Sequence, residues 1–195
     1  MHAAVFGEFD RICRARGAGG AVLEIGAMPA ADTLLCLPAL AGAAERLGVN
    51  LDGPHDYGGF RIQRGDAHHL DLPAARFDTI LCNSVLEHDP TFWRTLAELR
   101  RVARPGALVV LGVPAFGPAP RRRVLARLRG LPVIGPRIEA RLASTPTLLP
   151  HHFPADYYRF SASAMREVLL AGLERIEVSV LLQPPRVIGA GTVPR

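Results

Sequence analysis

The stretch FDTILCNSVLEHDPTFWRTLAELRRVARPGALVVLGVP, residues 77–114, decides the fold class of this 195-residue chain. It opens with a short apolar run, Phe77–Cys82, which has the length and composition of a buried strand. A helix follows, with Asp89 predicted as its N-cap and Pro105-Gly106 as its stop. A second apolar run, Ala107–Val113, comes directly after that stop. The order strand, helix, strand predicts two parallel strands connected by a helix that packs across them.

The same alternation extends to both sides of this unit. It predicts an α/β, doubly wound, Rossmann-like fold in which helices cover both faces of a mostly parallel sheet. A further helix is expected over about 161–172, and the short connection at Pro184-Pro185 requires an antiparallel hairpin at one edge of the sheet. The seven predicted strands are Ala21–Gly26, Leu47–Leu51, Phe60–Arg64, Phe77–Cys82, Ala107–Val113, Ile176–Leu182 and Arg186–Gly191.

The domain organisation is predicted to be a single domain over residues 1–195, interrupted by an Arg- and Pro-rich insertion at about 115–150. Hydrophobic residues make up 49% of the chain and charged residues 21%, which is ordinary for one globular domain. Within the insertion, Arg121–Arg141 joins arginines to apolar side chains. This basic stretch is interpreted first as a lid over the substrate that a functional site in this domain would bind. The alternatives are a peripheral contact to anionic lipid or saccharide and a solvated face.

Charge and cysteine content exclude several classes of protein. The formal net charge is +5 and every basic residue is an arginine, yet no aromatic stacking platform accompanies the basic cluster, so no nucleic-acid partner is expected. The three cysteines lack C-x-x-C spacing, which argues against disulfides and structural zinc. The pairs His68-His69 and His151-His152 also lack metal-ligand spacing, so no metal is expected. Neither an export signal nor a membrane span is evident, which predicts a soluble, cytoplasmic protein.

The stretch VLEIGAMPAAD, residues 22–32, is a strand, a tight turn and the expected start of a helix marked by Pro29 and Asp32. Ligands bind at such junctions in α/β proteins. A dinucleotide-binding loop would show G-x-G-x-x-G, whereas this chain has Gly26, Met28 and Ala31 at the three glycine positions. The missing glycines argue against a nicotinamide dehydrogenase.

Three acids follow or end successive predicted strands: Glu24, Asp52 and Asp66. Because the carboxyl ends of parallel strands meet at one edge of a sheet, these side chains are expected around one crevice. A carboxylate accepts hydrogen bonds from both ribose hydroxyls, from an adenine amine or from an ammonium group. Three carboxylates would repel a pyrophosphate, so a ligand with a ribose, an adenine and a cationic tail is favoured. S-adenosylmethionine has these parts.

The motifs together resemble the class I S-adenosylmethionine-dependent methyltransferase family. The resemblance rests on VLEIGA, NLDG, GDAHHLDLP, FDTILCNSVLEHDP and ELRRVARPGALVVLGVP, and it covers about residues 22–114, with a weaker likeness in the tail DYYRFSASAMREVLLAGL. It implies an enzyme with S-adenosylmethionine as cofactor. By the family pattern, the cofactor-binding residues are Glu24 and Gly26 for the amino-acid end, Asp52 for the ribose, Asp66 and Ala67 for the adenine, and Asn83 near the methyl group.

Methyl transfer requires an aligned nucleophile, and a general base only where the acceptor is weakly acidic. His88 is the candidate base, because an unperturbed imidazole titrates near neutrality. The alternative is that His88 only fixes the turn before Asp89. Tyr157 and Arg159, in HHFPADYYRF at 151–160, are the predicted acceptor-binding residues.

The predicted reaction is methyl transfer to a small-molecule or saccharide acceptor, at oxygen. The acceptor class is an analogy with the tails of methyltransferases in saccharide and small-molecule pathways. The alternative is a noncatalytic binding module with the same fold, because Met28-Pro29 departs from the family loop. No oligomeric state is indicated.

Overall fold

The structure is a computed structural model and describes residues 1–116 and 155–195. Eight strands are present in these two ranges, and all belong to one sheet. Their bounds are β1 Ala21–Ile25, β2 Glu45–Asn50, β3 His55–Tyr57, β4 Phe60–Arg64, β5 Phe77–Asn83, β6 Ala103–Pro114, β7 Glu174–Leu182 and β8 Pro185–Thr192.

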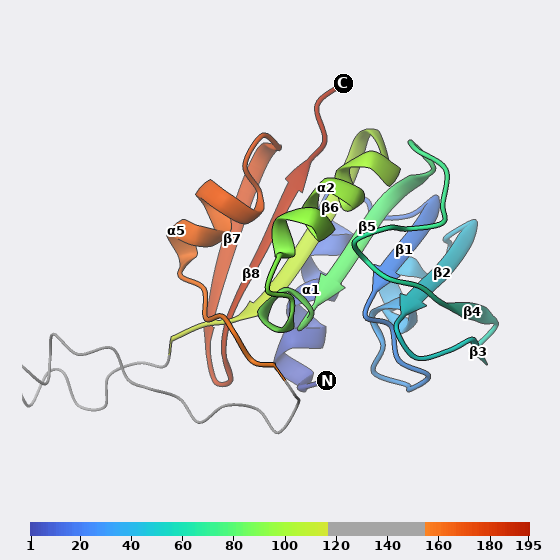
Figure 1. The fold of residues 1–195 in the computed structure, drawn as a ribbon, viewed down its shortest axis with the longest axis horizontal. Coiled ribbons are helices and arrows are strands. Elements are labelled where there is room, and N and C mark those ends of the chain that lie inside the picture. The colour runs from blue at the N-terminus through green and yellow to red at the C-terminus, as the bar shows by residue number, and fades with distance from the viewer. Residues whose placement is uncertain (117–154) are drawn as a thin grey trace, which may run out of the picture.

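The strand order across the sheet is β3-β4-β2-β1-β5-β6-β8-β7 (Figure 1). Strands β4, β2, β1, β5 and β6 are parallel to one another, whereas β8 pairs antiparallel with both β6 and β7. The central strands are apolar and buried on both sides, as expected for a parallel sheet with two covered faces. The predicted doubly wound fold with an antiparallel hairpin at one edge is therefore confirmed.

Helices cover both faces of the sheet, with α1 behind it and α2 and α5 in front of it in Figure 1. One apolar cluster joins α1 and the short 3₁₀ turns to the sheet, and a second joins α2 and the late helical segment to the opposite face. The bounds of these elements are α1 Ala3–Arg16, η1 Leu34–Cys36, η2 Pro38–Leu40, η3 Leu86–His88, α2 Phe92–Val102, α5 Ala162–Ala164 and η4 Met165–Leu169. None of the helices in the described ranges is long and apolar enough to cross a membrane.

The eighth strand, β3, was not predicted. It consists of three residues, His55–Tyr57, and pairs only with β4, to which it is antiparallel. Its side chains are polar or half-buried and the run is too short to show an alternating pattern, so no periodic signal marks it. It adds an edge to the predicted parallel core without changing the order of the other strands.

The prediction that a helix starts at Pro29 and Asp32 is wrong. Between β1 and β2 the chain forms only η1 and η2, two single turns separated by Leu37. Pro38 begins the second turn, and a proline cannot donate the backbone hydrogen bond that a continuous helix would need there. The leucines of this segment are buried together rather than along one helical face. Together with α1, these leucines cover the face of the sheet that a longer helix would otherwise cover.

The helix after β5 begins later than predicted. Its first residue is Phe92 and its N-cap is Thr91, so the assignment of Asp89 as N-cap is wrong. The Asp89 carboxylate still accepts a hydrogen bond from the Thr91 N–H at 2.8 Å and one from the Thr95 hydroxyl at 2.7 Å. Asp89 therefore fixes the first turn from outside the helix, where a carboxylate also favours the positive end of the helix dipole.

Two further boundaries differ from the predictions. Strand β6 starts directly after α2, at Ala103, so Pro105-Gly106 lies within the strand instead of separating it from the helix. The late helix is one turn of α5 followed by a π-helical turn, η4, in which Val168 is exposed. From residue 117 on, the predicted insertion lies outside the described residues, as do Arg121–Arg141 and His151-His152.

Candidate functional site

A cavity of about 960 Å³ opens at the carboxyl ends of the parallel strands. This volume is in the range of sites that bind drug-sized ligands and cofactors. Its walls come from the ends of β1, β2, β4 and β5, from η3 and from the start of β8. The cavity brings together the predicted residues Glu24, Gly26, Asp52, Asp66, Ala67, Asn83 and His88.

Gly26 forms the turn after β1 with a positive φ of 81°. A Cβ at this position would lie 2.4 Å from Cγ2 of Val85, which also lines the cavity. Both the backbone conformation and the close approach therefore require glycine. Met28, two residues on, is 54% exposed at the cavity wall, so its side chain does not close the space that a ligand would occupy.

Glu24 is buried and holds the segment after β1 against the strand. Its Oε2 atom accepts hydrogen bonds from the Thr33 hydroxyl at 2.6 Å and from the Leu35 N–H at 3.0 Å. Burial raises the pKa of Glu24 to about 7, although the bonds from Thr33 and from the backbone act in the opposite direction. A cationic ligand group in the cavity would favour the ionised form of this carboxyl.

Asp52 and Asp66 lie at the rim of the cavity and are accessible. The Asp52 side chain is 90% exposed, and its backbone N–H donates to Asn50 Oδ1 at 3.2 Å. Asp66 Oδ1 accepts from the His68 N–H at 2.9 Å, which fixes the turn that also presents Ala67. These carboxylates point from the ends of β2 and β4 and retain acceptor capacity for a ligand.

His68 connects two carboxylates at the edge of the cavity. Its Nε2 atom lies 2.8 Å from Asp89 Oδ1, and its Nδ1 atom lies 3.9 Å from Asp66 Oδ1. Burial acts to raise the pKa of Asp89, but hydrogen bonds from Thr95, His68 and Thr91 outweigh it and lower that pKa. In the described ranges no group of three or more His, Cys, Asp or Glu side chains is arranged to hold a metal ion.

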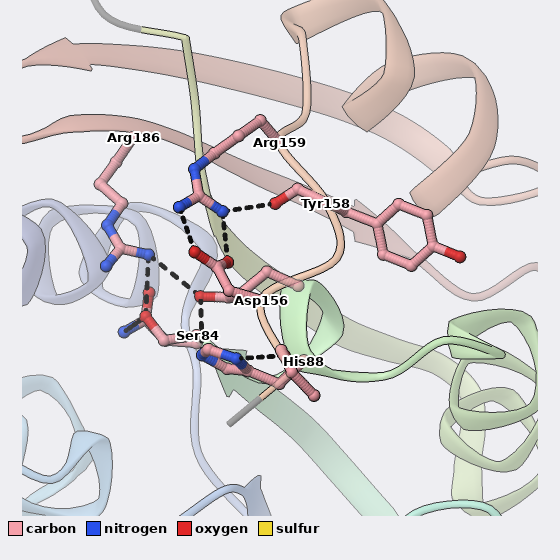
Figure 2. Close-up of polar contacts among 9 residues, drawn as sticks. Ser84, His88, Asp156, Tyr158, Arg159 and Arg186 are labelled. Atoms are coloured by element: carbon pink, nitrogen blue, oxygen red, sulfur yellow. Dashed lines mark hydrogen bonds and ion pairs between the residues drawn. The ribbon is translucent and has the colours of Figure 1, made fainter. Parts of the chain in front are cut away.

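The opposite end of the cavity is lined by residues after β5 and by the start of β8. Figure 2 shows Ser84, His88 and Arg186 from this part of the chain. Ser84 has a positive φ of 56°, a strained conformation of the kind found at functional sites. Its hydroxyl accepts a hydrogen bond from Arg186 Nη1 at 2.8 Å, and the same nitrogen lies 3.5 Å from Oε1 of Glu87. Glu87 is buried, and burial raises the pKa of its carboxyl despite the nearby Arg186 and His88.

His88 lies at the end of η3 with part of its ring accessible. Nδ1 is 2.9 Å from the carbonyl oxygen of Ala155, and Nε2 is 3.9 Å from Glu87 Oε1. A carbonyl can only accept, so Nδ1 carries the proton in this contact, and in the neutral ring Nε2 is then a proton acceptor. This tautomer is the one that a general base working through Nε2 requires.

Tyr157 and Arg159 are not among the residues that line the cavity. The Arg159 guanidinium pairs with both carboxylate oxygens of Asp156 and donates to the carbonyl of Tyr158 at 2.8 Å (Figure 2). The Tyr157 side chain is exposed, and its backbone N–H donates to the Glu87 carbonyl at 2.8 Å. This segment fastens the chain to η3, so the structure does not bring the two predicted acceptor-binding residues to the site.

Comparison with known proteins gives a match over the middle of the chain. A family model described as a methyltransferase domain matches residues 35–111. The match runs from η1 into β6. The match and the fold support the methyltransferase family predicted from the sequence. The matched range begins after β1, so it leaves out Glu24 and Gly26 as well as Met28-Pro29, where the sequence departs from the family pattern.

Solved structures of methyltransferases share this fold over almost the whole chain. A 1,6-didemethyltoxoflavin-N1-methyltransferase from Burkholderia thailandensis, with bound 1,6-didemethyltoxoflavin and S-adenosylhomocysteine, is 20% identical, with a TM-score of 0.65 over 98% of this chain and 79% of that one. A putative methyltransferase in complex with the Haloferax volcanii methyltransferase activator Trm112 is 15% identical, with a TM-score of 0.64 over 98% of this chain and 92% of that one. A putative methyltransferase from Bacillus halodurans is 11% identical, with a TM-score of 0.59 over 99% of this chain and 100% of that one. No curated protein sequence matches the chain.

Sequence reasoning missed three residues that shape the cavity: Ser84, Arg186 and His68. The strained backbone of Ser84 leaves no trace in the residue type. Arg186 is 102 residues away from Ser84 along the chain, and only the antiparallel placement of β8 beside β6 brings them together. His68 was noticed as part of a histidine pair, but its carboxylate partners could not be assigned before the fold was known.

Proposed function

We propose that this methyltransferase binds S-adenosylmethionine in the cavity at the ends of the parallel strands and transfers its methyl group to a hydroxyl oxygen of a small-molecule or saccharide acceptor. The observation that carries the proposal is the placement of Glu24, Asp52 and Asp66 around one cavity of about 960 Å³. When bound, the cofactor supplies an electrophilic methyl group on a sulfonium. A cytoplasmic location and the absence of a nucleic-acid partner are parts of the same proposal.

The proposed cofactor contacts follow the order of the strands. Asp52, after β2, accepts from the ribose hydroxyls, and Asp66 with Ala67, after β4, contact the adenine. Glu24 and Gly26 hold the amino-acid end, where the ammonium group favours an ionised Glu24. Asn83, at the end of β5, lines the floor near the sulfonium, and its buried Oδ1 atom has no hydrogen-bond partner among residues 1–116 and 155–195.

His88 is the proposed general base for an oxygen acceptor. Its Nδ1 contact with the Ala155 carbonyl orients the ring and leaves Nε2 as the acceptor in the neutral state. Removing a proton from a hydroxyl as the methyl group arrives makes the oxygen a better nucleophile. A nitrogen acceptor, such as the one named for the Burkholderia thailandensis structure, can supply its own lone pair and has less need of this residue.

A noncatalytic binding module remains the second candidate. The observation that favours it is the altered loop at Met28-Pro29, together with a family match that starts only at residue 35. The exposure of Met28 argues against a loop that fills its own cofactor site. The two candidates differ in whether the cavity binds the cofactor with useful affinity.

The test is calorimetric titration of S-adenosylmethionine and S-adenosylhomocysteine into the purified chain, with Asp52→Ala and Asp56→Ala compared side by side. Asp56 is an exposed carboxylate four residues away, on β3, and does not line the cavity. We expect Asp52→Ala to weaken binding about 10-fold or more, because a hydrogen bond to a charged group contributes about 1.5–3 kcal/mol. Binding unchanged in Asp52→Ala, or absent from the native chain, would contradict the proposed cofactor site.

A further inference from the structure

Arg186 differs in charge from the other ionised side chains around the cavity. Among the lining residues of ranges 1–116 and 155–195 it is the sole arginine, whereas the acidic ones are Glu24, Asp32, Asp52, Asp66 and Asp89. The N-terminal ammonium of Met1 also lies at the cavity, where it is paired with Asp32. Its side chain is only 14% exposed, so its position is defined by the surrounding protein. Because the Met1 ammonium is already paired with Asp32, the Arg186 guanidinium creates a local preference for an anion at its own end of the cavity.

The contacts of Arg186 leave most of its hydrogen-bonding capacity unused. Nη1 contacts the Ser84 hydroxyl at 2.8 Å and Glu87 Oε1 at 3.5 Å. Within the described part of the chain, Nε and Nη2 have no hydrogen-bond partner. A guanidinium has five N–H donors in a planar fork that matches a carboxylate or a phosphate. The contact with Ser84 holds this fork in place while leaving one edge available.

Glu87 does not fully neutralise Arg186. The distance of 3.5 Å is long for a charge-assisted hydrogen bond, which is normally about 2.7–2.9 Å. Burial also raises the pKa of the Glu87 carboxyl, which favours its neutral form. An anion that reaches Arg186 from the cavity therefore meets a positive charge that is only partly balanced.

The place of Arg186 in the sheet decides which ligand it faces. The proposed cofactor contacts come from β1, β2 and β4, with Asn83 at the end of β5. Arg186 is the second residue of β8, where it pairs with Pro114 of β6, and two strands separate β8 from β1. This position is on the far side of Asn83 from the adenosine contacts, where an acceptor would approach the methyl group.

We propose, on the basis of the proposed function, that Arg186 binds an anionic group of the acceptor, a carboxylate or a phosphate, and so restricts the enzyme to acidic acceptors. Ser84 is the positioning residue for the guanidinium. The cofactor's own carboxylate is the other source of the same chemistry, and the experiment has to separate the two.

The experiment is an NMR titration of inorganic phosphate and of benzoate into the chain saturated with S-adenosylhomocysteine. It compares the native chain with Arg186→Met, Arg186→Lys and the control Arg94→Met, in which an exposed arginine of α2 outside the cavity is replaced. We expect the control to bind both anions like the native chain, Arg186→Met to bind them about 10-fold more weakly or worse, and Arg186→Lys to fall between. The affinity for S-adenosylhomocysteine should stay within about 2-fold in all four proteins.

Other results would overturn the proposal. Equal anion binding in the native chain and Arg186→Met would mean that Arg186 only balances Glu87. Weaker binding of S-adenosylhomocysteine to Arg186→Met, with unchanged binding of 5′-methylthioadenosine, which lacks the carboxylate, would assign Arg186 to the cofactor. If Arg186→Met does not fold, the test uses the side-chain Nε–H resonance of Arg186 in the native chain. We expect this resonance to shift when phosphate is added, and no shift would also overturn the proposal. The native affinity for S-adenosylhomocysteine reports separately on the proposed function.

Discussion

Among single residues, Glu24 makes the stability of the fold depend on pH. Burial raises its pKa to about 7 in the folded chain, from a usual value of 4.5. Between these two values the folded chain holds more protons on this carboxyl than the unfolded chain does, so a rising pH lowers the free energy of unfolding. We expect the native chain to lose about 1–3 kcal/mol more than Glu24→Gln between pH 5 and pH 8, measured by urea unfolding without ligand.

Glu24→Gln is the matched control because its amide oxygen can still accept from the Thr33 hydroxyl and the Leu35 N–H. Asp10→Asn, outside the cavity, reports on any general effect of removing a carboxylate. Parallel stability profiles for the native chain and Glu24→Gln would show that the buried carboxyl ionises normally.

His88→Ala separates catalysis from cofactor binding. We expect its affinity for S-adenosylhomocysteine to remain within about 2-fold of the native value. Transfer to a hydroxyl acceptor should fall about 10²–10⁴-fold, the usual contribution of a general base. The measurement is incorporation of radiolabelled methyl groups from S-adenosylmethionine into a metabolite extract, with the exposed His69→Ala as control. Equal incorporation by the native chain and His88→Ala would exclude His88 as the base.

The cofactor side of the candidate site could be predicted from the sequence because its residues follow the ends of parallel strands. Glu24, Asp52 and Asp66 share that position in the pattern, and the topology of a doubly wound sheet brings such positions to one edge. The acceptor side could not be predicted in the same way. Arg186 reaches it from an antiparallel strand, and Arg159 is directed to Asp156 by a local ion pair that its residue type does not reveal.

Among the elements, a Gly→Ala substitution is expected to lower the free energy of unfolding in strand β6 and to raise it in helix α1. A Cβ at Gly112 in β6 would lie 2.4 Å from Asn83 Oδ1 and 2.8 Å from the Phe9 ring, whereas a Cβ at Gly7 in α1 has nothing within 4 Å. We expect Gly112→Ala to destabilise the fold by about 1–3 kcal/mol through overpacking. Gly7→Ala should stabilise it by about 0.5–1 kcal/mol, because alanine loses less backbone entropy in a helix.

Urea unfolding of the two variants at one pH gives both values. Gly112→Ala should also weaken binding of S-adenosylhomocysteine, since the added methyl group displaces Asn83 from the cavity floor. A Gly112→Ala variant as stable as the native chain would mean that β6 and α1 are less closely packed at this point than the structure has them.

Elements with a strong apolar pattern were predicted well, and those held by tertiary contacts were not. The core strands and the hairpin of β7 and β8 were recognised from apolar runs and a short connection. The chain between β1 and β2 was misassigned because its leucines are buried by packing under the sheet, with Glu24 accepting the Leu35 N–H. Three polar residues form β3 only because β4 offers them a partner. Local sequence carries little information about either outcome.

At the scale of the whole molecule, the cavity is lined by residues from both halves of the sheet. Its wall runs from Asp66, after β4, to Arg186 at the start of β8. A ligand that binds only the folded chain raises the free energy of unfolding by about 2.7 kcal/mol at 100 times its Kd. S-adenosylhomocysteine should therefore raise the Tm in one cooperative transition, and the shift at the same ligand concentration should be smaller for Asp52→Ala. Two separate transitions, with only one shifted, would contradict a cavity shared by the whole domain.

The central claim is that the cavity at the carboxyl ends of the parallel strands is a cofactor site. A crystal structure of the chain grown with S-adenosylhomocysteine tests it most directly. The ribose hydroxyls should lie within hydrogen-bond distance of Asp52, the adenine should lie against Asp66 and Ala67, and the sulfur should lie near Asn83, with the Arg186 end of the cavity left for the acceptor. S-adenosylhomocysteine bound elsewhere, or in this cavity with its adenine at the β8 end, would contradict the account.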